Sequence, residues 1–258
     1  MNNSTAAAPR IAIITGGSRG LGRSMALHLA DRGVDVIFTY VTNAAAARAV
    51  ASEIEAKGRK AIALPLDVGQ SDTFPAFADA VRAALRTGWQ RESFDYLVNN
   101  AGTSLHAPFA TTTEAQFDEV FRVHLKGTFF VTQRLLPLVA DGGRIVHISS
   151  GLARFTFPGS SAYAAMKGGI EVLTRYLALE LGARGITVNT IAPGAIETDF
   201  SGGMVRDNKQ MNAQIASHTA LGRVGLPDDV GAATALLLSP DSRWITGQRI
   251  EVSGGCLV

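Results

Sequence analysis

Short apolar runs alternate with longer segments of helical periodicity along almost the whole chain. The runs are nearly continuously apolar and rich in β-branched residues, which is typical of parallel strands covered on both faces. Strand–helix alternation with short connections predicts an α/β fold, a single-domain doubly wound parallel sheet (Rossmann fold). We expect strands at Ile11–Ile14, Val34–Tyr40, Ala61–Leu66, Tyr96–Asn99, Arg144–Ile148, Thr187–Ile191 and Arg249–Val252. We expect helices at Leu21–Asp31, Ala44–Lys57, Thr73–Leu85, Glu114–Leu138, Ala162–Leu181 and Asp228–Leu238.

Two segments depart from this alternation. Residues 1–9 are small and polar, and we interpret them as a disordered tail before a domain that spans 10–258. Ser201–Thr219 carries two glycines, two methionines and many polar residues, and we interpret this irregular stretch as a lid over a cleft. No linker rich in proline, glycine or serine divides the chain.

Composition narrows the class of protein. With 47% apolar and 18% charged residues, the 258-residue chain should be compact and ordered. A net charge of +2 without a basic cluster argues against a nucleic-acid or anionic-membrane partner. The one cysteine, Cys256, has no internal disulfide partner, and no metal-ligand spacing is present, so we expect no metal and a cytoplasmic location. No apolar stretch approaches the roughly 20 residues needed to span a bilayer.

A glycine-rich turn follows the first expected strand. Gly16, Gly20 and Gly22 precede and open the first helix. Glycines permit a tight turn and close approach of a pyrophosphate, while the helix N-terminus offers free N–H groups. We therefore expect this turn, including Ser18, Arg19 and Leu21, to bind a dinucleotide, although a purely structural turn is the alternative. No Gly-Lys-Ser/Thr follows, which disfavours a P-loop.

The end of the second strand bears on which dinucleotide is bound. An acidic residue there would hold the ribose hydroxyls of NAD and repel a 2′-phosphate. This chain instead has neutral hydrogen-bonding residues, among them Tyr40 and Thr42, and Arg19 lies in the glycine turn. These residues favour NADP (as NADPH) over NAD. The alternative for Arg19 is a solvated side chain.

Tyr163 and Lys167 stand four residues apart on an expected helix, so they share one face. An adjacent ammonium favours the phenolate and should lower the pKa of Tyr163 from about 10, making it a usable acid or base. Ser150 follows the strand Arg144–Ile148 and is placed to donate a hydrogen bond to a substrate oxygen. A surface pair on an amphipathic helix is the alternative, and the joint presence of the glycine turn and the serine disfavours it.

Taken together, these residues resemble the short-chain dehydrogenase/reductase family, most of all its 3-oxoacyl-carrier-protein reductase group. The turn from Thr15 to Gly22 is similar to the family's TGxxxGxG, residues 99–102 to its NNAG, and Ser150, Tyr163 and Lys167 to its catalytic residues in order and spacing. The resemblance implies a homotetramer, with Lys167 also binding the nicotinamide ribose. It further implies cofactor contacts from Tyr163, Lys167, Asp67, Val68, Asn99, Ala101, Gly102, Pro193, Gly194, Ile196 and Thr198.

One residue departs from the family pattern. His124 lies in Val123–Phe129, where the family usually has an asparagine that helps to hold a proton-relay water. Histidine also carries hydrogen-bonding nitrogens and titrates near neutrality, so we include His124 among the catalytic residues. The alternative is a packed residue that displaces the water and impairs activity.

The sequence thus predicts an NADPH-dependent oxidoreductase that reduces a ketone to a secondary alcohol, reversibly, with Tyr163 as proton donor. Its partner is a small-molecule carbonyl or alcohol. The loop Gly151–Pro158, with Met204 and Met211 of the expected lid, suggests a partly apolar pocket. A catalytically silent dinucleotide-binding or sensor protein is the alternative. A nucleotide-sugar epimerase is disfavoured because the length leaves no separate sugar domain.

Overall fold

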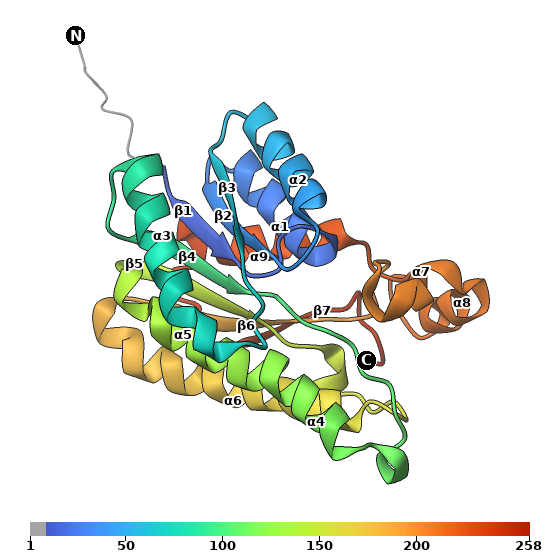
Figure 1. The fold of residues 1–258 in the computed structure, drawn as a ribbon. Coiled ribbons are helices and arrows are strands. Elements are labelled where there is room, and N and C mark those ends of the chain that lie inside the picture. The colour runs from blue at the N-terminus through green and yellow to red at the C-terminus, as the bar shows by residue number, and fades with distance from the viewer. Residues whose placement is uncertain (1–8) are drawn as a thin grey trace.

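The computed structural model describes residues 9–258, so all but the last residue of the expected tail, residues 1–9, lies outside the described part. Seven parallel strands form one sheet in the order β3-β2-β1-β4-β5-β6-β7 (Figure 1). This order reverses direction between β1 and β4, which creates a crevice at the carboxyl ends of these strands. The strands are β1 (Ile11–Ile14), β2 (Asp35–Tyr40), β3 (Ala61–Pro65), β4 (Phe94–Asn99), β5 (Val139–Ile148), β6 (Thr187–Pro193) and β7 (Arg249–Val252).

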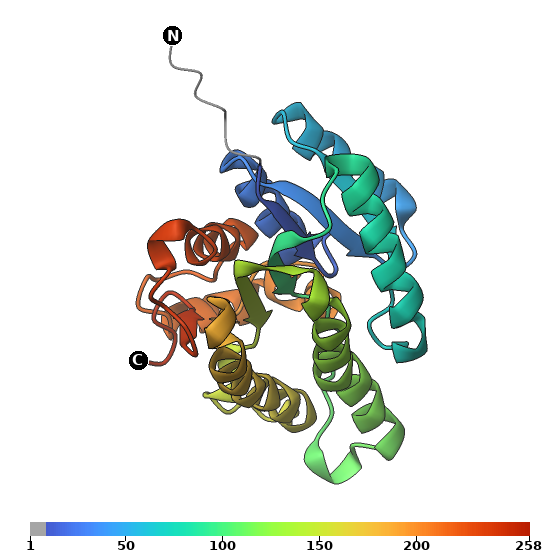
Figure 2. The same cartoon turned by 90° about the vertical axis from the view of Figure 1, so that its left-hand side faces the viewer.

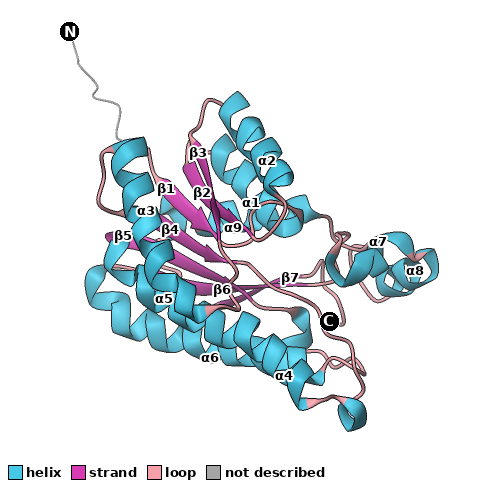
Figure 3. Cartoon of the chain, viewed as in Figure 1, coloured by secondary structure: helices cyan, strands magenta, loops and turns pink. Residues whose placement is uncertain are grey.

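Helices cover both faces of the sheet, in agreement with the continuous apolar runs (Figures 2 and 3). On one face Met25 and Leu29 of α1 and Val50 of α2 pack with α9 against β1 and β2. On the other, Phe77 of α3, Leu135 of α5 and Ala178 of α6 complete a second core. The helices are α1 (Gly20–Asp31), α2 (Ala44–Ala56), α3 (Phe74–Trp89), α4 (Glu114–Val120), α5 (Thr128–Leu135), α6 (Ser161–Leu181), α7 (Met204–Asp207), α8 (Lys209–Ser217) and α9 (Pro227–Leu237).

The strand prediction is confirmed at the centre of every strand, and the differences lie at the ends. β5 begins at Val139, five residues before the expected start at Arg144. Its first part contains Asp141, Gly142 and Gly143, a polar and glycine-rich segment that does not read as a strand. Pairing of Val139 with Phe94 of β4 nevertheless draws this segment into the sheet.

Two helical regions differ from the expectation. The segment expected as one helix, Glu114–Leu138, is α4 followed by a π-helix at Phe121–Gly127, then α5 and a short 3₁₀ turn. The segment expected to be irregular, Ser201–Thr219, is mostly helical, because it contains α7 and α8. Asn208 caps α8, and its side chain accepts a hydrogen bond from Met211 N.

α7 and α8 lie beyond the carboxyl ends of the strands, beside the chain's C-terminus (Figure 1). Three successive residues before them, Ser201, Gly202 and Gly203, have positive φ angles of 55°, 68° and 77°. Within the part of the chain that the structure covers, none of the helices combines the length and apolar character needed to cross a membrane.

Candidate active site

The carboxyl ends of β1 and β4 are joined by a polar network. The hydroxyl of Thr15 accepts hydrogen bonds from the backbone N–H groups of Asn100 and Ala101, both at 3.0 Å. The side chain of Asn100 donates to the carbonyls of Thr15 and Gly16 at 3.0 and 3.1 Å. Thr39 holds the other side of the turn, since its hydroxyl accepts from Gly16 N at 2.9 Å. Sequence reasoning missed these supporting roles of Thr15, Thr39 and Asn100, although two of the three lie within or beside recognised motifs.

The glycine turn forms a cradle that side chains would fill. Gly16 and Gly20 adopt φ angles of +68° and +54°, a region that glycine enters without strain. A Cβ at Gly22 would lie 2.2 Å from the carbonyl oxygen of Gly16, so no larger residue fits. The N-terminus of α1 has no side-chain cap and no acidic residue in its first turn. Its unpaired N–H groups and positive dipole end suit the pyrophosphate of a dinucleotide.

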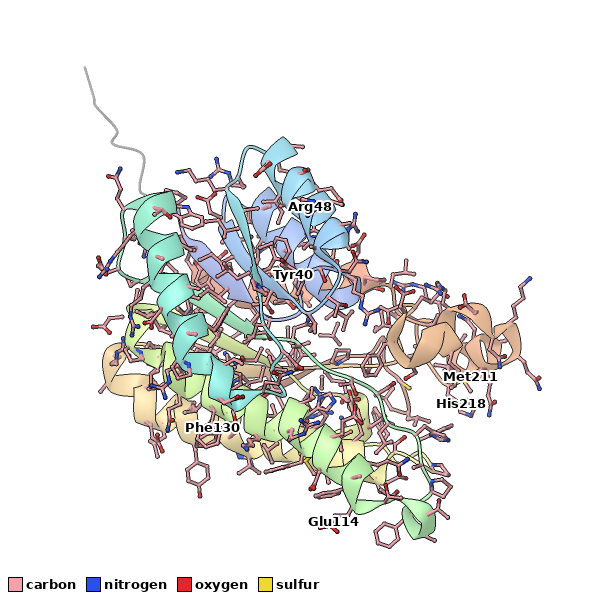
Figure 4. All side chains as sticks on the ribbon, viewed as in Figure 1. Tyr40, Arg48, Glu114, Phe130, Met211 and His218 are labelled. Atoms are coloured by element: carbon pink, nitrogen blue, oxygen red, sulfur yellow. The ribbon has the colours of Figure 1, made fainter. Side chains whose placement is uncertain are left out.

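The groups expected to distinguish NADP from NAD surround this cradle. Arg19 is exposed at the N-cap of α1, and Thr42 is also exposed. Figure 4 shows Tyr40 at the end of β2, and this residue is half-buried. Asp67 lies further along the same edge, and its carboxylate accepts from Gly69 N at 2.8 Å. None of the residues 41–43, directly after β2, is acidic, so the region fits an anionic 2′-phosphate better than bare ribose hydroxyls.

The segment after β6 folds over the same cradle. Ile196 forms a parallel bridge with Gly225, which leads the chain back across the sheet edge. The Thr198 side chain lies 3.8 Å from the position of a Cβ on Gly20, and its hydroxyl accepts from Phe200 N at 3.1 Å. Pro193 ends β6 and is buried, with Gly194 directly after it. Thr198 therefore lies beside the glycine turn, and the cofactor contacts expected of this segment stay a prediction.

Tyr163 and Lys167 lie on the buried face of α6, as their spacing predicted. The Lys167 ammonium donates a 2.7 Å hydrogen bond to the carbonyl of Ile148, the residue that ends β5. Its Nζ lies 5.6 Å from the centre of the Tyr163 ring. The pair thus lies inside the molecule, at the carboxyl end of β5. This excludes the alternative of a solvated pair on the surface of an amphipathic helix.

Burial, rather than the ammonium, dominates the ionisation of this pair. It raises the pKa of Tyr163 to about 12, although a hydrogen bond with Ser150 opposes the shift. It also lowers the pKa of Lys167 to about 7. The expectation that Lys167 would lower the pKa of Tyr163 is therefore not met here, because desolvation penalises both charged forms. The phenol is protonated at neutral pH.

Ser150 joins this pair from the end of β5. The residue is in extended backbone and caps the short 3₁₀ turn Gly151–Ala153, with its hydroxyl accepting from Leu152 N at 3.2 Å. The turn carries the chain away from the sheet and leaves the Ser150 side chain beside Tyr163.

His124 is part of the same cluster. Its ring centroid lies 5.0 Å from that of Tyr163, with the planes at 87°. Its Nε2 lies 2.7 Å from the carbonyl oxygen of Thr103 and 3.3 Å from Thr103 N, and the shorter contact favours Nε2–H as the donor. The buried Nδ1 has no partner among residues 9–258. Burial and the charge of Lys167 lower the imidazole pKa to about 3. His124 is therefore a neutral hydrogen-bonding group, contrary to the expectation of titration near neutrality.

The space beside His124 depends on Gly102. A Cβ there would lie 2.7 Å from His124 Cε1. Asn99, the first residue of this motif, is buried and donates to the Thr132 hydroxyl at 2.9 Å. It thus ties β4 to α5 rather than projecting into the crevice.

A cavity of about 500 Å³ lies beside the Gly151–Pro158 loop. We call it the Phe-lined cavity. Neither Met204 nor Met211, which lies on α8 in Figure 4, contributes to its lining. The loop contributes apolar residues to the lining, as expected, whereas the two methionines belong to α7 and α8. The Phe-lined cavity is lined by Pro108, Phe109, Leu152, Phe155, Thr156, Phe157, Pro158, Gly159, Ser160, Ser161 and Ala164.

Comparison with known proteins identifies the family. Residues 16–256 match the family model described as enoyl-(acyl carrier protein) reductase, a branch of the short-chain dehydrogenases. The chain is a member of the short-chain dehydrogenase/reductase family. The resemblance drawn from the sequence motifs is thereby confirmed.

Similar family members are reductases. The chain is 34% identical to the hydroxynaphthalene reductase-like protein Arp2 of Metarhizium brunneum, over 96% of this chain and 95% of that protein. It is 36% identical to LugOII, a promiscuous reductase that catalyses keto-reduction at C1 in lugdunomycin biosynthesis, with a TM-score of 0.91 over 96% and 98% of the two chains. It is 34% identical to the angucycline C-6 ketoreductase LanV with bound NADP, with a TM-score of 0.91 over 96% and 95%.

Proposed function

We propose that this family member reduces a ketone on a fused aromatic ring system to a secondary alcohol, with NADPH as its cofactor. The observation that carries the proposal is the cluster of Ser150, Tyr163 and Lys167 at the carboxyl ends of the parallel strands, the same end of the sheet that carries the glycine cradle. NADPH supplies the hydride when bound. The chain's own residues bind the cofactor, hold the carbonyl oxygen and deliver a proton to it.

Tyr163 is the proton donor in this proposal. A phenol whose pKa is about 12 holds its proton at neutral pH and gives it up when negative charge develops on the substrate oxygen. Ser150 donates a hydrogen bond to the same oxygen. Lys167 stands behind the ring, where its ammonium stabilises the phenolate as it forms. The same group serves the reverse reaction, in which the phenolate accepts the proton of the alcohol.

The cradle residues hold the cofactor. Gly16, Ser18, Gly20, Leu21 and Gly22 would offer backbone N–H groups to the pyrophosphate, and Arg19 would pair with the 2′-phosphate that distinguishes NADPH. Tyr40 and Thr42 would line the adenosine end, where NAD would bind less well. The contacts attributed by resemblance to Asp67, Val68, Ala101, Gly102, Pro193, Gly194, Ile196 and Thr198 complete this proposed binding site. The Asn99 side chain supports it from behind, since it is bonded to Thr132.

The substrate class rests on two observations. The relatives include reductases named for hydroxynaphthalenes and for angucycline ketones. The Phe-lined cavity carries three phenylalanines and two prolines, which suits flat apolar rings. Most of its lining comes from residues 152–164, the part of the chain that joins Ser150 to Tyr163. Met204 and Met211, on α7 and α8, lie outside the lining of this cavity.

A cofactor-consumption assay tests this function. Purified protein is mixed with NADPH or NADH and with matched ketones, such as a tetralone, a linear 3-oxo thioester and cyclohexanone. We expect NADPH oxidation that is fastest with the fused-ring ketone. Turnover of the linear thioester alone would reject the substrate class. Absence of turnover with every ketone, together with tight NADPH binding, would favour a catalytically silent sensor.

We also propose that the protein is a homotetramer. Apolar residues on α4, the π-helix, α5 and α6 are exposed in the single chain, and Figure 4 shows Phe130 at the outer face of α5. Burial of such a surface against a second copy removes it from water. The exposed residues are Phe117, Phe121, Phe129, Phe130, Val172, Tyr176 and Leu179. Residues 10–258 act as one domain in this proposal, and the single cysteine supports a cytoplasmic location.

A further inference from the structure

Behind Ser150 lies a cluster of four charged side chains that the proposed chemistry does not use. Arg249 of β7 donates from Nε to Glu171 Oε1 at 2.7 Å and from a terminal nitrogen to Glu251 Oε2 at 2.9 Å. Arg154 donates to the same Glu251 oxygen at 3.1 Å. The side chains of Arg249, Glu171 and Glu251 are only 20%, 15% and 18% exposed. Charges this far from water are costly unless they are paired, so the cluster acts as a unit.

This cluster contacts both Ser149 and Ser150, the two residues that follow β5. The Ser149 hydroxyl donates to Glu171 Oε1 at 2.7 Å. The second terminal nitrogen of Arg249 reaches the carbonyl of Ser150 at 3.4 Å. One arginine therefore contacts the backbone of Ser150 directly and the neighbouring Ser149 through Glu171.

The same cluster is joined to the helix that carries the phenol. Tyr163, Lys167 and Glu171 follow each other at intervals of four residues on α6, so they share one face. Ser149 Oγ also lies 3.3 Å from the carbonyl of Lys167, a second and more distant acceptor for the same hydroxyl proton. Arg249 thus ties three elements together: the edge strand β7, the end of β5 with Ser150, and the catalytic face of α6.

We propose that Arg249 and Glu171 are positioning residues that fix the Ser150 hydroxyl relative to the Tyr163 phenol. The proposal rests on the proposed roles of Ser150 and Tyr163. Neither charged residue touches the substrate. Ser150 lies two residues beyond the end of β5 and caps a 3₁₀ turn, so its backbone is not held by strand pairing. The Arg249–Glu171 pair supplies that restraint.

The primary test is a mutant cycle between Arg249→Met and Ser150→Ala, measured on a ketone that the parent reduces. In the parent background, we expect Arg249→Met to lower kcat by about 10- to 100-fold, the loss typical of a misplaced catalytic group. In the Ser150→Ala background the same substitution should have almost no further effect, since the group that it positions is gone. NADPH affinity, measured by fluorescence titration, should be unchanged in every variant. Equal losses of kcat in both backgrounds would overturn the proposal.

Arg184→Met is the matched control. Arg184 is also a partly buried arginine that donates to backbone carbonyls, those of Leu136 and Val139, and it pairs with Asp141. These contacts lie at the opposite end of β5, far in sequence from Ser150. We expect Arg184→Met to lower the melting temperature with kcat retained. If kcat falls as much as in Arg249→Met, general destabilisation explains both variants and positioning is rejected.

Arg249→Lys and Glu171→Gln keep the test decisive if Arg249→Met does not fold. Lysine retains the charge but not the planar guanidinium group that contacts Glu171, Glu251 and the Ser150 carbonyl together. We therefore expect a kcat between those of the parent and Arg249→Met. Glu171→Gln retains a hydrogen-bond acceptor for Ser149, and its kcat should fall while KM for the ketone stays unchanged. Parental kcat in both variants would contradict the proposal. A parent without ketone turnover, or an active Tyr163→Phe, would instead reject the proposed function itself.

Discussion

The imidazole of His124 stands edge-on to the phenol of Tyr163, with the ring centroids 5.0 Å apart. The contact depends on the π-helix that contains His124 and on the absence of a side chain at Gly102. Such short π-helical segments are frequent at functional sites. The residue that departs from the family pattern therefore packs directly on the proposed proton donor, rather than lying in an unrelated part of the core.

We expect His124→Asn to preserve or raise the reduction rate, since asparagine restores the family's usual group at this position. His124→Ala should lower the rate, because it removes the unpartnered Nδ1 acceptor and the ring that packs on Tyr163. The pKa of His124 is about 3, so the imidazole stays neutral and the parent-to-variant rate ratio should be constant from about pH 6 to 9. Steady-state kinetics across this range measures the ratio. Parental rates in both variants would assign His124 a packing role only.

Tyr163→Phe should reduce turnover by at least a hundredfold, because general-acid catalysis contributes about 10²–10⁴-fold. The phenol is buried, and loss of one hydroxyl leaves the ring contacts with His124 and Phe200 in place. NADPH titration and the melting temperature should therefore match the parent. A variant that retains more than about a hundredth of the rate would show that another group protonates the oxygen.

Arg19→Ala should weaken NADPH binding by about 1.5–3 kcal/mol, the range for hydrogen bonds to charged groups, and leave NADH binding nearly unchanged. Arg19 is exposed at the uncapped end of α1, so its loss removes a phosphate partner without opening the core. Fluorescence titration of both reduced cofactors measures the difference. Arg48 on α2 (Figure 4), also exposed, provides a matched substitution. An equal loss for NADH and NADPH would exclude recognition of the 2′-phosphate by Arg19.

Acid should destabilise the fold through two buried histidines. His147 is fully buried and bonds the Thr174 hydroxyl at 2.9 Å, and burial lowers the pKa values of His147 and His124 to about 3 from 6.5. Between these values the unfolded chain binds more protons than the folded one, so stability falls as pH drops from about 6.5. The loss is up to about 3 kcal/mol per histidine at pH 4.

Urea unfolding at neutral and acidic pH tests this prediction. The free energy of unfolding of His147→Asn should depend less on pH than that of the parent. His218→Asn, on the exposed end of α8 (Figure 4), should behave like the parent. An undiminished acid loss in His147→Asn would mean that other groups account for it.

Features set by local chemistry were predictable from the sequence. Apolar runs located the strands, and the glycine turn located the cradle, because each follows from burial or backbone freedom over a few residues. The proximity of Lys167 and Tyr163 followed from helical spacing. The pKa values of the two groups did not follow from it, since desolvation depends on elements distant in the chain. The extension of β5 to Val139 depends on pairing with Phe94, and the Thr15–Asn100 network on contact between two strand ends. Neither tertiary contact leaves a pattern in the local sequence.

The π-helix also matters for transplanting segments between relatives. A stretch of i→i+5 hydrogen bonds holds one residue more than an α-helix of equal turns, while α4 and α5 continue on either side. A donor segment one residue shorter would leave the flanking helices intact and rotate whatever occupies position 124 away from the phenol by roughly 100°, the angle per residue of an α-helix. Chimeras that exchange this region therefore need to carry Phe121–Gly127 as one block, together with the glycine at 102 that makes room for the imidazole.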